Sequence, residues 1–381
     1  MKLEFTHNEA PTLGVELELA LVDGRTMALS SSAQQLLERV PPHYVDSIKP
    51  ELMQCYVEIN SSVCRTVAEA EADLRAKVIA VEQIADELDI RLLWSATHPF
   101  STWKDQQVTP NARYLMLVEL LQDMARQLIT FGLHVHVGVD SGDKAVMICD
   151  RIMKYLPALL AISCNSPCWD GRITGLQSSR SKVMEGLPTA GLPYAMRNWS
   201  EYTWLINHLI ETEFIHTIRE IWWDVRPHHN FGTVEVRVCD MPANLQDVST
   251  ITALIQCLVK SLSDEIDQGC WRPESHPMMV RQNKWRACRY GPRARLVNPT
   301  THQAETVAEI VDKLLTRLTP VAKDLGCTAE LARASDLATR PSGADRQLAL
   351  LQECATPEEA VRRLTEISRL STPRSETRQV A

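Results

Sequence analysis

The chain has 381 residues, 45% of them hydrophobic, which is enough for a sizeable core, and its net charge of −8 argues against an electrostatic nucleic-acid binder. No apolar run reaches the roughly 18 residues of a membrane span, and residues 1–14 lack the apolar region of a signal peptide. The 11 cysteines are odd in number and scattered, so we expect reduced thiols in a cytoplasmic protein.

The hydrophobic pattern alternates between strands and long helices. Residues 12–22 predict a strand, and residues 46–60 predict a loop followed by a strand. Thr66 and Glu69 are spaced as a capping box at the start of a helix over residues 66–88. The further expected elements are a buried strand at 90–95, a helix at 111–128 leading into a His-bearing strand, a helix at 144–163, an antiparallel hairpin of IREIWWDVRPH with FGTVEVRVCD, and helices at 246–267, 275–290 and 302–370.

The periodicity breaks between residues 164 and 200, where Gly, Pro, Ser and Arg dominate. A structureless stretch of that length inside a compact domain is usually functional or mobile, so we expect it to line the mouth of a site as a lid. The sequence shows no repeat and no linker-like change of composition. We therefore expect one α+β catalytic domain over residues 1–370 with a helical C-terminal region, followed by a disordered tail at 371–381.

Three of the predicted strands carry two polar residues spaced two apart. Residues i and i+2 of a strand point to the same face, and burying such a pair is costly unless it meets a metal or an opposite charge. Solvent-facing strands are the alternative, but each pair lies amid apolar residues. One face of the sheet is therefore expected to hold cations and an anionic substrate. The pairs are Glu16 with Glu18, His134 with His136, and Glu235 with Arg237.

More carboxylates and several arginines fit the same kind of site. Glu51 lies in a Pro-Glu loop, and Glu58 follows in the next strand-like run. Mg²⁺ prefers oxygen ligands, and an imidazole among them is better tolerated by Mn²⁺. Arginine forks match carboxylates and phosphates. The candidate arginines, in or beside the irregular stretch and the hairpin, are Arg172, Arg180, Arg197, Arg226 and Arg237.

The His-Val-His strand leaves zinc as an alternative. A zinc site would need a third histidine or a cysteine nearby, and His98, His228 and His229 are available, although none stands in a zinc motif. The chain contains no Walker A motif, no GxGxxG after a strand and no GxSxG. The common nucleotide-binding and hydrolase signatures are therefore absent from the sequence.

On these motifs the chain resembles the carboxylate–amine ligase family related to bacterial glutamate–cysteine ligase type 2. More distantly, the EVRVCD run resembles a segment of glutamine synthetases. The family commonly has three consecutive acids in its first motif, and here Leu17 replaces the middle one and points away from the pair. The matching runs are TLGVELELALVD, KPELMQCYVEI, ATHPFSTWKDQQVTPNARY, FGLHVHVGVD, SPCWDGRITGLQSSRSKVMEGLPTAGLP and WWDVRPHHNFGTVEVRVCD, in this order across most of residues 11–300.

The resemblance implies a glutamine-synthetase-like fold, in which an antiparallel sheet presents a concave active-site face and is backed by helices. It also implies a phosphate-contacting role for Arg237, and we assign a catalytic role to Arg226 beside it. The implied metal ligands are Glu16, Glu18, Glu51, Glu58, Glu235 and His136, with His134 as the alternate histidine. Substrate or nucleotide binding is assigned to His134, Arg172, Arg180 and Arg197.

The expected activity is that of an ATP- and Mg²⁺-dependent ligase, with Mn²⁺ as an alternative ion. It would activate a carboxylate as an acyl phosphate, which an amine then attacks; the resemblance suggests L-glutamate and cysteine. We expect a homo-oligomer, such as a dimer. Two other classes stay open: an amino-acid or guanidino kinase on the same scaffold, and a non-catalytic protein that binds metal or amino acids.

Overall fold

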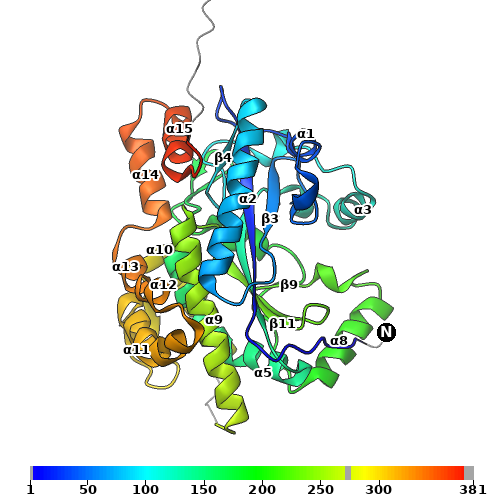
Figure 1. Ribbon diagram of the computed structural model, residues 1–381, viewed down its shortest axis with the longest axis vertical. Helices are drawn as coiled ribbons and strands as arrows, with labels where there is room; N and C mark the ends of the chain where they lie inside the picture. The colour runs from blue at the N-terminus through cyan, green and yellow to red at the C-terminus, as the bar shows by residue number, and fades with distance from the viewer. Residues whose placement is uncertain (1–2, 271–275, 373–381) are drawn as a thin grey trace, which may run out of the picture.

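The computed structural model of the protein describes residues 3–270 and 276–372, and it is built around one antiparallel sheet (Figure 1). The strands follow the order β10-β11-β5-β1-β3-β2, and β4 pairs with the far end of β1. The predicted α+β class with an antiparallel sheet backed by helices is confirmed. The strands are β1 (Leu13–Asp23), β2 (Ile48–Pro50), β3 (Tyr56–Asn60), β4 (Ile90–Leu93), β5 (Gly132–Gly138), β10 (Val225–His228) and β11 (Thr233–Asp240).

The central strand β1 shows why the two faces of the sheet differ. Leu17 and Leu19 are fully buried on one face, whereas Glu16 and Glu18 alternate with them and point to the other. The same alternation in β5 puts Val135 in the core. Each of these strands therefore contributes its apolar side to the core and its polar side to one common surface.

The longest helices cover the apolar face of the sheet. Helix α2 (Val67–Glu87) packs against β1 and β3, and α9 (Leu245–Asp267) packs against β5 and α2 (Figure 1). The predicted capping box is present, since Thr66 accepts from the backbone of Glu69 and the Glu69 carboxylate accepts from the backbone of Thr66. A reciprocal cap of this kind fixes the start of α2 at the edge of the sheet.

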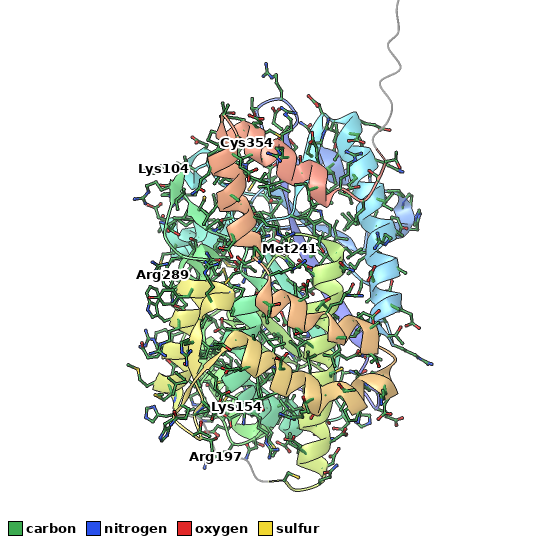
Figure 2. The ribbon with its side chains drawn as sticks, turned by 90° about the vertical axis from the view of Figure 1, so that its left-hand side faces the viewer. Lys104, Lys154, Arg197, Met241, Arg289 and Cys354 are labelled. Atoms are coloured by element: carbon green, nitrogen blue, oxygen red, sulfur yellow. The ribbon has the colours of Figure 1, made fainter. Side chains whose placement is uncertain are left out.

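Shorter helices complete the fold, and those of the C-terminal third lie together on the side that faces the viewer in Figure 2. The predicted helices at 144–163 and over most of 302–370 are present, but a small hairpin of β12 (Arg295–Val297) and β13 (Ala304–Thr306) was not predicted. The helices of this group, apart from those named elsewhere in this subsection, are α1 (Ala33–Leu37), α5 (Gly142–Ile152), α6 (Leu156–Ser163), α10 (Pro277–Tyr290), α11 (Val307–Leu325), α12 (Thr328–Ala332), α13 (Ala334–Thr339), α14 (Gly343–Glu353) and α15 (Pro357–Ser368).

Two of the expected elements differ in the structure. The predicted helix at 111–128 is divided into α3 (Ala112–Leu121) and α4 (Asp123–Arg126), because Gln122 between them has a positive φ of 49°. The predicted hairpin is confirmed for β10 and β11. Its expected first strand begins differently, since Ile218–Glu220 form a 3₁₀ helix and β9 (Trp222–Trp223) pairs in parallel with β8 (Ala190–Gly191).

The prediction that residues 164–200 lack structure is wrong. Residues 163–168 and 177–181 are buried, and hydrogen bonds hold them against the end of β11. The order comes from polar contacts of Ser and Asn side chains, which leave no hydrophobic period in the sequence. The elements found there are β6 (Cys168–Trp169), β7 (Arg172–Ile173), α7 (Ser179–Met184), β8 and the start of α8 (Trp199–Glu211).

Both ends of the described chain lie along other elements. Residues 3–12, here called the N-terminal arm, run past α8, where Trp199 Nε1 donates to the Leu3 carbonyl at 3.1 Å (Figure 1). At the other end, the Ser371 amide donates to Glu82 at 2.6 Å. The rest of the predicted tail, from residue 373 on, lies outside the described residues. Within the described ranges, none of the helices combines the length and apolar character needed to cross a bilayer.

Candidate active site

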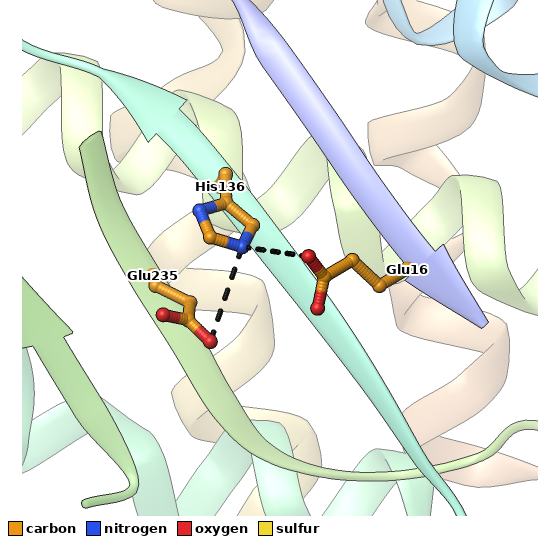
Figure 3. A group of neighbouring side chains, drawn as sticks. All are labelled: Glu16, His136 and Glu235. Atoms are coloured by element: carbon orange, nitrogen blue, oxygen red, sulfur yellow. Dashed lines mark ion pairs between the residues drawn. The ribbon is translucent and has the colours of Figure 1, made fainter. Parts of the chain in front are cut away.

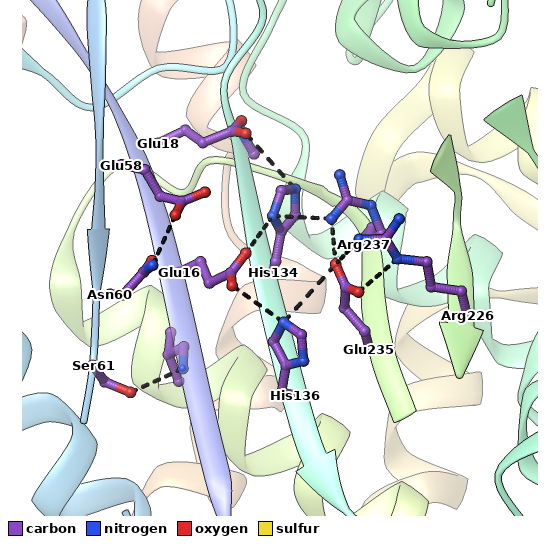
Figure 4. Close-up of polar contacts among 12 residues, drawn as sticks. Glu16, Glu18, Glu58, Asn60, Ser61, His134, His136, Arg226, Glu235 and Arg237 are labelled. Atoms are coloured by element: carbon purple, nitrogen blue, oxygen red, sulfur yellow. Dashed lines mark hydrogen bonds and ion pairs between the residues drawn. The ribbon is translucent and has the colours of Figure 1, made fainter. Parts of the chain in front are cut away.

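The polar face of the sheet gathers side chains from five neighbouring strands (Figure 4). Glu16 of β1 lies opposite Asn60 of β3 and His134 of β5. One step along, His136 of β5 lies opposite Glu235 of β11, which in turn lies opposite Arg226 of β10. The predicted same-face arrangement of the polar pairs is therefore confirmed. The carboxylates of β1 and β3 lie on one side of the two histidines, and the arginines lie on the other.

Glu16, His136 and Glu235 form the most compact group (Figure 3). His136 Nε2 lies 3.3 Å from Glu16 Oε1 and 3.9 Å from Glu235 Oε1, and one potential ligand atom from each residue lies within 4.8 Å of the others. A contact of 3.0 Å between His136 Nδ1 and Thr233 Oγ1 orients the ring so that Nε2 faces the carboxylates. Two carboxylates and an oriented imidazole could hold a divalent cation.

The charges in this group stabilise one another. Burial raises the pKa of Glu16, but the charge of His136 and hydrogen bonding to His134 outweigh it and hold this pKa well below its usual value. Burial opposes the charged form of His136, yet Glu235 and Glu16 raise its pKa overall. Glu235 is also buried, and Arg226 and Arg237 hold its pKa well below the ordinary value. Both carboxylates are therefore ionised at neutral pH, as metal ligands must be.

His134 lies between the acidic and basic halves of the face. Its Nδ1 is 3.0 Å from Glu16 Oε2 and 3.4 Å from Arg237 Nη1, and its Nε2 is 3.9 Å from Glu18 Oε1. Burial and the nearby Arg237 lower its pKa. A neutral His134 can bridge the two halves. His136 instead directs its Nε2 toward Glu16 and Glu235.

Three further carboxylates, those of Glu18, Glu51 and Glu58, crowd together beside the compact group. Burial and the charge of Glu18 raise the pKa of Glu51 to about 7, and burial together with Glu16 and Glu51 raises that of Glu58 well above its usual value. Their hydrogen bonds come from neutral groups, the Gly132 amide to Glu18 and Asn60 Nδ2 to Glu58 at 2.7 Å. Among the described residues, no lysine or arginine forms a salt bridge with this trio.

Two arginines converge on Glu235 from the opposite side. Arg226 Nε donates to Glu235 Oε2 at 2.7 Å, and its Nη1 donates to the Ile221 carbonyl at 2.6 Å. Arg237 Nη1 donates to Glu235 Oε1. One carboxylate thus holds two partly buried guanidinium groups in fixed orientations, and the remaining N–H groups of Arg237 are available to an anionic ligand.

Arg180 adds a third guanidinium on the same face. Its side chain is 5% exposed, and it lies directly over Gly132, where even a Cβ atom would collide with its Nη2. Its one hydrogen bond from the guanidinium goes to the Arg237 carbonyl at 3.3 Å, and no carboxylate of the described residues lies within salt-bridge distance of it. The glycine is required here because the guanidinium occupies the space of a side chain.

Asp240 positions Arg180 and was not predicted from the sequence. It is fully buried at the end of β11 and accepts from Ser166 Oγ at 2.6 Å and from Ser178 Oγ at 2.8 Å. Ser166 Oγ in turn accepts from the Arg180 amide at 3.1 Å. The sequence did contain a hint of this contact. Asp240 ends the strand that carries Glu235 and Arg237, and the segment 164–200 is rich in serines that could donate to it.

The remaining predicted residues lie apart from this cluster. Arg172 is exposed in β7, and the Arg197 side chain is 86% exposed and pairs with Glu201 at 3.1 Å. His98, considered for zinc, is buried in a turn where its Nε2 contacts the Met27 carbonyl at 2.9 Å. The structure shows no contact between these three residues and the polar face.

The residues of the face fit a bound divalent cation. The Nε2 atoms of His134 and His136 are buried and have no hydrogen-bond partner among the described residues. Close to them are five carboxylates, three of which form no salt bridge with any lysine or arginine that the structure describes. A hard cation would accept these atoms as ligands and would offset the burial and mutual repulsion that raise the pKa of Glu51 and Glu58.

Comparisons with known proteins agree on one group of relatives. The sequence profile described as "Glutamate-cysteine ligase family 2 (GCS2)" matches residues 12–367. The chain is 40% identical over 349 residues to "Putative glutamate--cysteine ligase 2" of Gloeobacter violaceus, covering 91% of this chain and 94% of the relative. It is 38% identical over 377 residues to the protein of the same name from Thermobifida fusca, covering 98% of this chain and 94% of the relative.

Solved structures share the fold at low sequence identity. The glutamate–cysteine ligase of Francisella tularensis, solved in complex with AMP, has a TM-score of 0.68 at 13% identity and covers 97% of this chain and 91% of its own. The bifunctional glutathione synthetase of Pasteurella multocida also has a TM-score of 0.68 at 13% identity. The match covers 94% of this chain and about half, 52%, of that enzyme.

Proposed function

The chain belongs to glutamate–cysteine ligase family 2 and is an enzyme that forms carbon–nitrogen bonds; we propose that it does so with ATP, through an acyl-phosphate intermediate. The observation that supports this most is the division of the polar face into an acidic and a basic half. Five carboxylates can hold cations, and Arg237, fixed beside Arg226 by Glu235, can hold phosphoryl oxygens. Phosphoryl transfer needs this combination, because its catalysis is mostly positioning and electrostatic stabilisation.

We propose that divalent cations, Mg²⁺ or Mn²⁺, are held by two sets of residues. Glu16, His136 and Glu235 would form one site, and Glu18, Glu51 and Glu58 the other. When bound, such ions neutralise phosphate charge and polarise phosphoryl oxygens. His134 is the alternate histidine for the first site and otherwise contacts substrate or nucleotide.

The arginines have distinct proposed roles. Arg237 reaches the transferred phosphoryl group with the N–H groups that Glu235 leaves free. Arg226 is fixed between Glu235 and the Ile221 carbonyl, and it keeps that carboxylate ionised and oriented. Arg180 approaches from the opposite end of the face, beside Glu18, and binds an anionic group of the substrate. Arg172 and Arg197 remain proposed substrate contacts that would require their segments to move toward the face.

The proposed substrates follow the names of the relatives. L-Glutamate is the carboxylate, whose oxygen attacks the γ-phosphorus of ATP and releases ADP; an amine such as cysteine then attacks the acyl carbon and releases phosphate. An adenine nucleotide is consistent with the AMP bound to the Francisella tularensis ligase. We propose a homo-oligomer, such as a dimer, as the working assembly.

Isotope transfer tests the acyl phosphate directly. The protein is incubated with ATP, Mg²⁺, an amine mixture containing cysteine, and L-glutamate labelled with ¹⁸O in its side-chain carboxylate. Mass spectrometry should find amide product together with one ¹⁸O atom in each phosphate released. ATP consumption that yields a stable phosphorylated product and no amide would instead indicate a kinase, and amide formed with unlabelled phosphate would rule out the acyl phosphate.

A further inference from the structure

An exposed aromatic ring lies at the edge of the polar face, where no role has been assigned to it. Phe231, at the tip of the hairpin between β10 and β11, is 56% exposed. Its ring stacks on that of His228 with centroids 4.2 Å apart and an interplanar angle of 15°. It also meets the ring of His136 edge-on at 5.6 Å. Because His136 belongs to the compact group and shares its face, Phe231 lies on the same side of the sheet as the proposed metal site.

The tip that carries Phe231 is fixed by the N-terminal arm. Asn8 Nδ2 donates to the carbonyls of Phe231 at 2.7 Å and Gly232 at 2.8 Å, and Thr6 Oγ1 donates to that of Asn230 at 2.9 Å. Gly232 has a φ of +64°, and a Cβ there would collide with the Thr6 carbonyl. The backbone around Phe231 is thus held in one conformation, although its ring is largely in solvent.

This arrangement suits a planar ligand. His228 stacks on the Phe231 ring, and Phe231 is 56% exposed, so a ligand ring can approach it from solvent. A rigid support means that little conformational freedom is lost when a ring binds there. An exposed phenylalanine beside buried charges contributes little to folding, whereas base–aromatic stacking is a common and sequence-tolerant source of nucleotide affinity.

We propose that Phe231, supported by His228, is the platform on which the base of the nucleotide stacks. The inference rests on the proposed function, because it needs the triphosphate to lie at the compact group of Glu16, His136 and Glu235. His136 contacts both the carboxylates and Phe231, so a nucleotide whose phosphates meet that group has its base directed along the same strands toward the hairpin tip.

Binding of two ligands to the full-length protein tests the platform. Calorimetry measures the Kd of Mg·ATP and of Mg·tripolyphosphate, which has the phosphates but no base. Phe231→Ala should weaken Mg·ATP about tenfold, equivalent to about 1.4 kcal/mol, and leave tripolyphosphate unchanged. Phe231→Trp should keep Mg·ATP affinity. The matched control is Phe214→Ala, which removes a phenylalanine that is 72% exposed just after α8, and it should change neither Kd.

Each other outcome has a definite meaning. Unchanged Mg·ATP affinity in Phe231→Ala overturns the platform, as does an equal loss for both ligands, which would show a disturbed metal site. If the unsubstituted protein consumes ATP but Phe231→Ala binds it normally, only the platform fails. If the unsubstituted protein does not bind Mg·ATP at all, the proposed function fails and the platform with it.

Discussion

Glu18 and Glu235 are both carboxylates of the polar face, but they have opposite surroundings. Glu18 lies among other acids, whereas the Glu235 side chain is 1% exposed and holds two guanidinium groups. We expect both Glu18→Gln and Glu235→Gln to abolish ATP turnover. Only Glu235→Gln should also destabilise the fold, by about 3 kcal/mol, because it leaves buried cations unpaired.

Urea unfolding of the two variants measures this difference. Glu18→Gln removes a charge from a repelling trio, so its free energy of unfolding should stay within about 0.5 kcal/mol of the unsubstituted protein. A folded Glu18→Gln protein with normal turnover would contradict the metal assignment. Equal destabilisation by both substitutions would show that the trio already has a counter-charge.

Arg237 allows a test of guanidinium geometry at constant charge. Arg237→Lys keeps the positive charge but loses the fork that can contact Glu235 and a phosphoryl group together. We expect kcat to fall at least about tenfold, or about 1.4 kcal/mol of transition-state stabilisation. Steady-state kinetics separates this from the competing outcome, a higher KM for ATP with unchanged kcat, which would make Arg237 a uniform binding contact.

Among the elements, the segment at residues 186–198 is the best candidate for a moving lid. Asp240 holds Asn165, Ser166 and Ser178, but Tyr194 is 76% exposed, and the Arg197 side chain is 86% exposed and pairs with the nearby Glu201. We expect amides of 186–198 to gain protection from hydrogen exchange when a non-hydrolysable ATP analogue and glutamate bind, because closure would exclude water from the acyl phosphate.

The anchored segment provides the internal control for that measurement. Amides of the buried residues 163–168 and 177–181 should be protected with or without ligands, because the bonds of these segments to Asp240 do not depend on the site being filled. If protection appears only on the paired strands and residues 186–198 exchange as before, the segment is a passive surface loop.

The elements show what the sequence could predict. A period of two in β1, β5 and β11 sufficed to place Glu16, His136 and Glu235 on one face, and a capping box marked the start of α2. Strand β8 was not predicted because two residues are too few to show an alternating hydrophobic pattern. The role of Asp240 was not predicted because it depends on serines about 60 to 75 residues away in the chain. Local sequence patterns do not show which distant residues come into contact.

For the molecule as a whole, metal binding should be coupled to stability. A ligand that binds only the folded protein at about 100 times its Kd adds about 2.7 kcal/mol, which corresponds to a rise in Tm of roughly 5 °C in a large domain. We expect Mg²⁺ or Mn²⁺ to raise the Tm and EDTA to reverse the effect. Glu16→Gln, which removes one charge from the compact group at nearly constant size, should lose most of this shift.

Thermal denaturation with and without each ion checks the expectation. A Tm that is insensitive to EDTA and to both ions would contradict metal binding at the polar face. An identical shift in the Glu16→Gln variant would place the bound ion elsewhere in the protein.

The order of strands across the sheet has a consequence for how the protein is made. The central strand β1 is synthesised first, yet its neighbour β5 begins at Gly132, and the next strand, β11, ends only at Asp240. Such distant pairings close long loops and are slow to form. During translation, β1 can pair with β3 and then β5, but β5 keeps an unpaired, apolar edge until β11 follows, when more than half of the chain has been synthesised. The polar face therefore exists only after β11, the last of the three strands, has docked beside β5.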